Sequence, residues 1–201
     1  MTKKQLLTPF LYLALILLVV FGIYKNFPRE YSFKGSVIDP RMEAFEFSLI
    51  DWEGKEFSIN DNRGEVIVLF FGYTNCPDVC PTTLVDFKNM IAQLDDGNDE
   101  VKFVMISVDP ERDTPERIYN YVSSFHPDIL GLSGTLNELK PIWENYFIGR
   151  VISDSEQGDG YLVEHTARIF VVDKTGALRE TFPLGMAIEL MISDIEYLIS
   201  E

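Results

Sequence analysis

The feature that most constrains this chain is the stretch Phe70–Pro81, which contains both of its cysteines. The apolar run Val66–Phe71 before them is typical of a buried strand, and Thr82–Leu94 after them has the pattern of a helix. Cys76 and Cys80 therefore lie where a strand passes into a helix N-terminus, whose N–H groups and positive dipole end favour thiolate over thiol. If the turn is already wound, their spacing puts both sulfurs on one helical face. Such a pair can close a disulfide or hold one soft metal ion.

The charge distribution separates an apolar N-terminus from an acidic remainder. All 32 acidic residues follow Tyr24, whereas two of the 17 basic residues, Lys3 and Lys4, precede it. This excess of negative charge argues against nucleic acid and anionic membrane surfaces as ligands, and it suits cations, a basic partner or simple solubility. Two cysteines do not make a disulfide framework for a domain of this size, which can fold on its hydrophobic core. The cysteine pair is therefore expected to be chemical rather than structural.

The N-terminal apolar run predicts a membrane anchor. Residues 5–24 carry no charge, and a helix of about 20 apolar residues matches the hydrocarbon thickness of a bilayer. A cleaved signal peptide is the alternative, but the run is longer than a usual signal core and no small-x-small cleavage site follows. We therefore expect a short cytoplasmic tail (1–4), a transmembrane anchor (5–24), a linker (25–40) and a folded domain (41–201). The basic residues on both sides of the run do not fix its orientation. The domain is placed outside the cytoplasm, on the cell membrane, only because of the function that the family resemblance given below implies.

Strands and helices alternate along the folded domain. Helix starts are marked by Thr114-Pro115 and by the capping box Thr135–Glu138. The predicted elements are a hairpin over 45–59, a strand at 66–71, helices at 82–94, 114–125 and 135–147, a strand at 101–108, a hairpin over 168–182 and a helix at 187–199. Residues 151–160 are expected to form a loop or a weak hairpin arm. This order predicts an α/β layer fold with parallel central strands, and the cysteine motif with the late hairpin points to a thioredoxin-like fold with an N-terminal hairpin extension.

One of the two histidines is a candidate partner of the cysteines. In a thioredoxin-like arrangement, the segment entering the strand at 168–172 passes close to the cysteine turn, where thioredoxins have a cis-proline. This chain has no proline between Pro141 and Pro183, so a side chain can fill that position, and His165 is the candidate. His126 is interpreted instead as a helix C-terminal residue that interacts with the helix dipole.

The residues alone leave several kinds of chemistry open. Two thiolates and an imidazole select copper(I), and the imidazole also supports copper(II). Zinc accepts the same atoms together with a fourth ligand. A purely redox-active pair needs only the cysteines and leaves His165 as a base or a bystander, and a structural disulfide is a further alternative. Asp78 either tunes the thiolates or is an exposed turn residue, and Asp109 either belongs to a site at the strand ends or forms a turn before Pro110.

Three sequence features together resemble the Sco/SenC family of cytochrome c oxidase assembly proteins. They are the segment Phe71–Pro81 (FGYTNCPDVCP), the segment Ser107–Pro115 (SVDPERDTP) and a histidine, His165, before a hairpin strand. The resemblance extends from about Glu43 to the C-terminus. It implies a thioredoxin-like fold, a membrane anchor with the domain outside the cytoplasm, and copper binding by Cys76, Cys80 and His165. The absence of a long transit peptide favours a bacterial source.

The resemblance also implies a function. The expected role is a metallochaperone that delivers copper to the dinuclear copper site of cytochrome c oxidase subunit II. Oxidation to a Cys76–Cys80 disulfide would prevent copper binding, so the redox state would gate it. The alternative is an enzyme, a thiol–disulfide reductase that keeps the subunit II cysteines reduced, and a peroxidase is a weaker third possibility. An upstream copper donor or a thiol reductant is a further expected partner. Nucleic acid is not expected as a partner.

Overall fold

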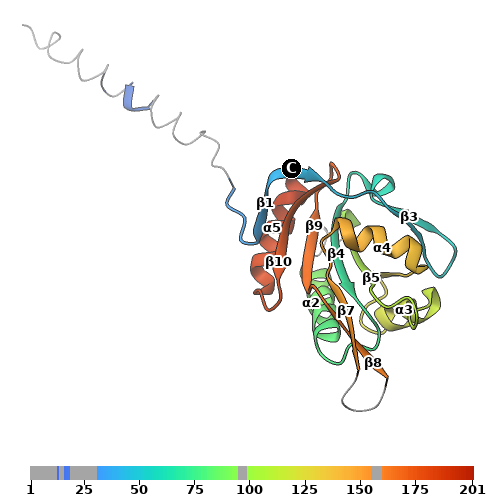
Figure 1. Ribbon diagram of the computed structural model, residues 1–201. Helices are drawn as coiled ribbons and strands as arrows, with labels where there is room; N and C mark the ends of the chain where they lie inside the picture. Colours follow the sequence, from blue (N-terminus) through green and yellow to red (C-terminus); the bar gives the residue numbers. More distant parts are fainter. Residues whose placement is uncertain (1–12, 14–15, 19–30, 95–98, 155–159) are drawn as a thin grey trace, which may run out of the picture. The chain divides into compact units, whose positions relative to one another are not determined.

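The computed structural model describes residues 13, 16–18, 31–94, 99–154 and 160–201 (Figure 1). The chain divides into two units, Met1–Ser32 and Phe33–Glu201, and the second is the folded domain. The predicted anchor over 5–24 lies almost wholly outside the described residues. Within the described part of the chain, no helix has both the length and the apolar character needed to cross a bilayer.

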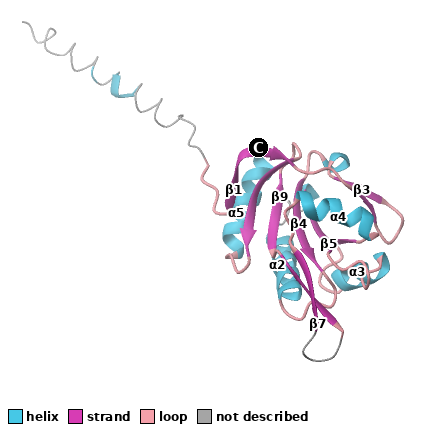
Figure 2. Cartoon of the chain, viewed as in Figure 1, coloured by secondary structure: helices cyan, strands magenta, loops and turns pink. Residues whose placement is uncertain are grey.

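A six-stranded mixed sheet forms the centre of the domain (Figure 2). The strand order is β1-β10-β9-β4-β5-β6, in which β4, β5 and β6 are parallel and β9, β10 and β1 are added antiparallel. These strands are β1 (Ser36–Glu43), β4 (Val66–Gly72), β5 (Val101–Ser107), β6 (Ile129–Leu132), β9 (Arg168–Val172) and β10 (Ala177–Pro183). The predicted parallel centre and late antiparallel hairpin are therefore confirmed.

Two separate hairpins and five helical segments complete the domain. The hairpins are β2 (Ser48–Ile50) with β3 (Glu56–Ser58), and β7 (Arg150–Asp154) with β8 (Tyr161–His165). The helices are η1 (Asn60–Asn62), α2 (Val79–Leu94), α3 (Pro115–Ser123), α4 (Leu136–Asn145) and α5 (Ile188–Ser200). The predicted caps are present, because Thr114 accepts a hydrogen bond from the Arg117 N–H and Thr135 forms a full capping box with Glu138. Local sequence thus sets where α3 and α4 begin.

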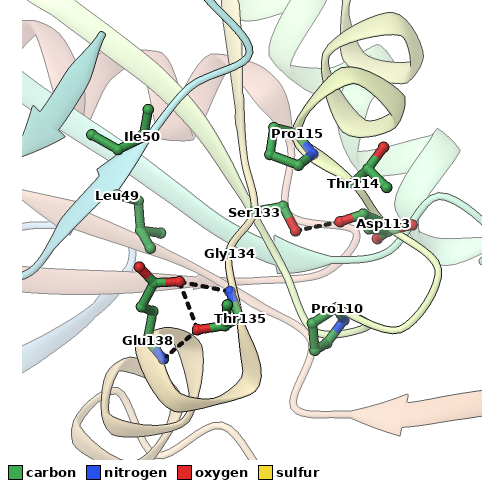
Figure 3. A pocket seen from close by; sticks show the side chains of 10 residues that line it. All are labelled: Leu49, Ile50, Pro110, Asp113, Thr114, Pro115, Ser133, Gly134, Thr135 and Glu138. Atoms are coloured by element: carbon green, nitrogen blue, oxygen red, sulfur yellow. Dashed lines mark hydrogen bonds between the residues drawn. The ribbon is translucent and has the colours of Figure 1, made fainter. Parts of the chain in front are cut away.

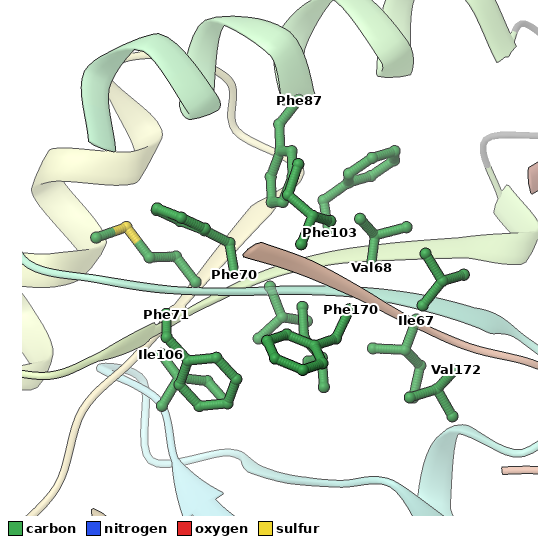
Figure 4. Close-up of a cluster of buried hydrophobic side chains, with 14 of the residues drawn as sticks. Ile67, Val68, Phe70, Phe71, Phe87, Phe103, Ile106, Phe170 and Val172 are labelled. Atoms are coloured by element: carbon green, nitrogen blue, oxygen red, sulfur yellow. The ribbon is translucent and has the colours of Figure 1, made fainter. Parts of the chain in front are cut away.

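The core lies on both faces of β4, every residue of which is buried. Successive side chains of a strand point to opposite faces. Phe70 packs edge-on against Phe87 of α2, whereas Phe71 packs against Phe170 and against Tyr146 at the end of α4 (Figure 4). Removing a buried phenylalanine side chain typically costs about 3–5 kcal/mol. The end of β4 is therefore a rigid support for the loop that follows it.

The structure differs from the predicted elements in three places. The predicted linker over 25–40 is too long, because Ser36–Pro40 belong to β1 and pair with β10; this strand is exposed on both faces and shows no alternation. Strand β6 is not foreseen, since it is short. Residues 151–154, the described start of the segment expected to be a loop or a weak hairpin arm, belong to the hairpin arm β7, so one of the two alternatives is found there. Helix α2 begins at Val79, earlier than predicted, which places Cys80 in its first turn.

Candidate metal and thiol site

The two cysteines lie together at the junction of β4 and α2. Cys76 is half-buried in the loop after β4, and Cys80 is fully buried in the first turn of α2. Both are free thiols. The backbone N–H of Cys80 donates to the Cys76 sulfur at 3.4 Å. The two sulfurs therefore occupy adjacent positions at a helix N-terminus, as the sequence predicts.

The two thiols differ sharply in acidity. The pKa of Cys76 falls to about 5, chiefly because the Cys80 thiol donates a hydrogen bond to it, with further help from the backbone N–H groups of Cys80 and Asp78. The same interaction raises the pKa of Cys80, and burial and the negative charge on Cys76 raise it further. At neutral pH the pair therefore consists of a reachable thiolate and a buried thiol that keeps its proton.

Gly72, the last residue of β4, leaves the space that the Cys80 sulfur occupies. A Cβ atom at this position would lie 3.0 Å from the sulfur, 2.9 Å from the terminal methyl of Met105 and 2.7 Å from the Phe70 ring. Such contacts are too short for any real side chain. The close approach of strand and sulfur therefore requires glycine at this position.

His165 lies at the end of β8, beside the cysteine loop. Its ring packs edge-on against Phe70 and Tyr73, with ring centroids 6.3 and 6.0 Å apart. Burial lowers the pKa of His165, so the imidazole is neutral at pH 7. Its Nδ1 lies 3.1 Å from the carbonyl oxygen of Thr166, an atom that can only accept, so Nδ1 carries the proton. The lone pair is therefore on Nε2 and free to bind a metal ion.

His165 is near the sulfurs but not yet at ligand distance. The charge on Cys76 affects the pKa of His165, and the reverse also holds, which places them in one electrostatic environment. Within the described residues, no three His, Cys, Asp or Glu side chains lie close enough to hold a metal ion together. The donor atoms match a soft metal ion in chemistry. Binding through all three requires further convergence of the side chains.

The structure adds one residue to the site that the sequence interpretation missed. Asp113 is buried and accepts hydrogen bonds from the Thr74 N–H at 3.1 Å, the Thr74 hydroxyl at 2.6 Å and the Ser107 hydroxyl at 2.7 Å. Burial raises its pKa, although these three donors oppose that effect. Asp113 thereby holds the loop that carries Cys76. A carboxylate directly before a helix cap is usually exposed, so its burial is not evident from sequence.

Of the other candidates, Asp78 acts on the thiolate through its backbone N–H, which helps to lower the pKa of Cys76, whereas the contacts of His126 and Asp109 are structural. The Asp78 carbonyl accepts hydrogen bonds from the backbone and hydroxyl of Thr82, in the turn that starts α2. His126 follows α3, and its Nδ1 lies 3.7 Å from an Asp128 oxygen. Asp109 is fully buried and does more than form a turn, because it binds both Arg112 and Tyr161.

A pocket of about 410 Å³ is lined in part by residues that follow β5 (Figure 3). Asp113, Thr114 and Ser133 contribute to its wall, and the Ser133 hydroxyl donates to the Asp113 carbonyl. The pocket contains no sulfur or imidazole. The cysteines and His165 are not among the residues that line this pocket.

Comparison with known proteins places these features in a family. Residues 38–200 match the family model SCO1/SenC. A SCO2-like protein of Rickettsia prowazekii is 34% identical over 143 residues, which cover 70% of this chain and 69% of the relative.

Solved structures show the same fold. The solution structure of apo Sco1 from Thermus thermophilus has a TM-score of 0.75 and 32% identity, covering 85% of this chain and 99% of that one. The structure of Bradyrhizobium japonicum ScoI with copper bound has a TM-score of 0.71 and 36% identity, covering 78% of this chain and 99% of that one. The predicted thioredoxin-like α/β fold is thus confirmed for the domain.

Proposed function

We propose, from the fact that this chain belongs to the SCO1/SenC family, that it is a membrane-anchored metallochaperone for the dinuclear copper site of oxidase subunit II. Proteins of the family bind copper and take part in cytochrome c oxidase assembly. The observation that carries this proposal is the pairing of the Cys76 thiolate with the protonated Cys80, beside a neutral His165. These are soft donors, which favour copper.

Each proposed ligand has a distinct part in taking up the ion. Cys76 is already ionised and half-exposed, so it makes the first bond. Cys80 binds only after it loses its proton, because the thiolate is the ligand form. His165 offers Nε2 without any proton loss. Copper uptake at neutral pH therefore releases about one proton per ion, and acid weakens it.

The redox state gates this uptake. In a Cys76–Cys80 disulfide both sulfurs are bonded to each other, and neither remains as a thiolate ligand. Reduction restores the donor pair. The proposal therefore requires a thiol reductant as well as an upstream copper donor in the compartment where the domain works.

The proposed location is the outer side of the cell membrane. Residues 5–24 anchor the chain there, and the domain reaches subunit II by diffusion in the membrane plane. Release follows when the ligands of the subunit II site replace Cys76, Cys80 and His165 one at a time.

Copper titration of the reduced protein tests the ligand set. Sulfur-to-copper charge-transfer absorption and a melting temperature raised by several degrees are expected, since a ligand that binds only the folded state stabilises it. His165→Ala should abolish most of both signals, because one of three donors is lost. His126→Ala is the matched control and should behave as the parent protein. Equal binding by His165→Ala and the parent would refute the three-ligand site.

A thiol–disulfide reductase is the second candidate, and the unequal thiols favour it. The Cys76 thiolate would attack a substrate disulfide, forming a mixed disulfide and releasing one substrate thiolate. Cys80 would then lose its proton and attack the Cys76 sulfur, which closes the Cys76–Cys80 disulfide and releases the second thiolate. This activity needs no His165 ligand. Two results together would favour the reductase: weak copper binding by the parent protein, and reduction of a model disulfide by His165→Ala at the rate of the parent.

A further inference from the structure

We propose that the segment Ser107–Thr114 is a clamp that positions His165 relative to the two cysteines. The inference rests on the proposed function, since it assigns residues that hold the metal ligands without touching the metal. The segment follows β5 directly. One part of it binds the loop that carries Cys76, and another binds the hairpin that carries His165.

The first attachment holds the cysteine loop. Asp113 accepts from both the N–H and the hydroxyl of Thr74, two residues before Cys76. Asp113 is itself fixed, because Ser107 donates to its carboxylate and Ser133 to its carbonyl. The Cys76 loop is therefore tied to a carboxylate that has little freedom to move.

The second attachment holds strand β8. The Arg112 guanidinium lies 3.7 Å from the centroid of the Tyr161 ring and donates to the Tyr161 carbonyl at 2.9 Å. The Tyr161 hydroxyl in turn donates to Asp109 at 2.6 Å, and Asp109 forms an ion pair with Arg112. Asp109, Arg112 and Tyr161 thus form a closed triangle, with Tyr161 at the start of the strand that ends at His165.

A third attachment lies directly beside His165. Arg150 is opposite His165 in the β7–β8 ladder. Its Nε donates to the Val108 carbonyl at 2.6 Å, and its Nη2 bonds to Glu111 at 2.9 Å. The hairpin is therefore fastened to the clamp at both of its strands.

The hairpin needs these attachments because β7 and β8 pair only with each other in the sheets described. An isolated two-stranded hairpin is marginally stable in water. Its orientation is therefore set by side-chain contacts. Four hydrogen bonds join the hairpin to the clamp, beside one from the Val163 N–H to the Tyr73 hydroxyl in the cysteine loop. Residues that orient metal ligands typically affect metal affinity by about 10–100-fold when mutated.

Two substitutions test the clamp. Arg112→Met removes the guanidinium, and Tyr161→Phe removes only the hydroxyl. Arg41, which is exposed, and Tyr119, which is half-buried against Trp52, lie outside the clamp and give the matched controls Arg41→Met and Tyr119→Phe. The full-length reduced protein is used throughout, and Tyr161→Phe keeps the test possible if Arg112→Met does not fold.

Three readouts are measured on each variant. Arg112→Met should speed amide hydrogen exchange of β8 at least about tenfold, move the imidazole nitrogen NMR signals of His165, and raise the copper dissociation rate about tenfold. Tyr161→Phe should give smaller changes in the same direction, about threefold. The two controls should match the parent in all three.

The outcomes separate this inference from the proposed function. If the parent protein binds no copper, the metallochaperone proposal fails, and the exchange rates and His165 signals alone decide the clamp. If exchange and the His165 signals are unchanged in Arg112→Met and Tyr161→Phe, the clamp is refuted. Faster exchange with unchanged His165 signals also refutes it, because the segment would then stabilise the hairpin without positioning the histidine.

Discussion

Cys76 with Cys80 and Glu180 with Asp194 are two pairs of neighbouring acids in the folded domain. In each pair, one residue raises the pKa of the other. The hydrogen bond to Cys76 and the charge on Cys76 raise the pKa of Cys80. Burial, followed by the charge on Asp194, raises the pKa of Glu180 to about 8. The pairs differ in access. Cys76 is half-exposed, whereas Glu180 and Asp194 are wholly buried between β10 and α5.

The buried carboxyl pair holds the start of β1. A single oxygen of Asp194 accepts the backbone N–H groups of Lys34 and Gly35, at 2.7 and 2.9 Å. A Cβ atom on Gly35 would lie 2.3 Å from a Glu180 oxygen, so the chain passes very close to the pair. A shifted pKa therefore marks a structural contact at Glu180 and a reactive group at Cys76. The two pairs differ in solvent access, because Cys76 can be reached from solvent and the two carboxyl groups cannot.

The largest effect is expected from breaking the carboxyl pair. Asp194→Ala removes the carboxyl oxygen that accepts from the Lys34 and Gly35 N–H groups and empties a fully buried position, and it should lower the free energy of unfolding by about 4 kcal/mol. Denaturant unfolding measures this loss. Glu196→Ala, an exposed residue on the same helix, is the control. The alkylation rate of Cys76 should stay the same in both, and a slower or faster rate in Asp194→Ala would mean that the two pairs are coupled.

The pH dependence of stability gives the next largest effect. Glu180 binds its proton more tightly in the folded state, since its pKa is raised to about 8 from an ordinary value of 4.5. The stability that this proton binding contributes is therefore full at acid pH and is lost as the pH rises through 8, by up to roughly 4 kcal/mol between pH 5 and pH 9. Glu180→Gln stays neutral, so its stability should fall less between pH 5 and pH 9. Parallel pH profiles of the melting temperature for the two proteins would contradict this assignment.

The smallest effect is expected at the thiol pair. The pKa of Cys76 is lowered from 9.0 to about 5, and the hydrogen bond from Cys80 is the main cause. Cys80→Ala removes this bond, so the midpoint of the Cys76 titration should rise by about 2 pH units, or about 2.7 kcal/mol. The rate of Cys76 alkylation against pH measures it. Cys80→Ser keeps an O–H donor and should shift the midpoint less. An unshifted midpoint in Cys80→Ala would show that the backbone N–H groups alone stabilise the thiolate.

Local sequence signals predict much of the fold. The apolar run of β4, the caps of α3 and α4, and the late hairpin are all found, because each depends on neighbouring residues. Strand β1 is missed, since its partner β10 lies more than a hundred residues away and β1 has no buried face. Pairing at that distance leaves no periodic pattern in the sequence.

The sequence predicts where the two cysteines lie, but not which of the two sulfurs keeps its proton. The strand-to-helix position of Cys76 and Cys80 follows from the apolar run and the helix pattern around them. Which sulfur keeps the proton depends on the burial of Cys80, which is a tertiary property. The contacts of Arg112 with Tyr161 join segments that are 49 residues apart, so the sequence motif gives no sign of them.

Gly72 connects the packing of the domain with its reactivity. The same missing methyl group makes room for the Phe70 ring and Met105 on the core side and for the Cys80 sulfur on the site side. Selection for a well-packed interior and selection for an acidic thiol therefore act on one position. A side chain at this position would therefore disturb the interior and the thiol pair at the same time.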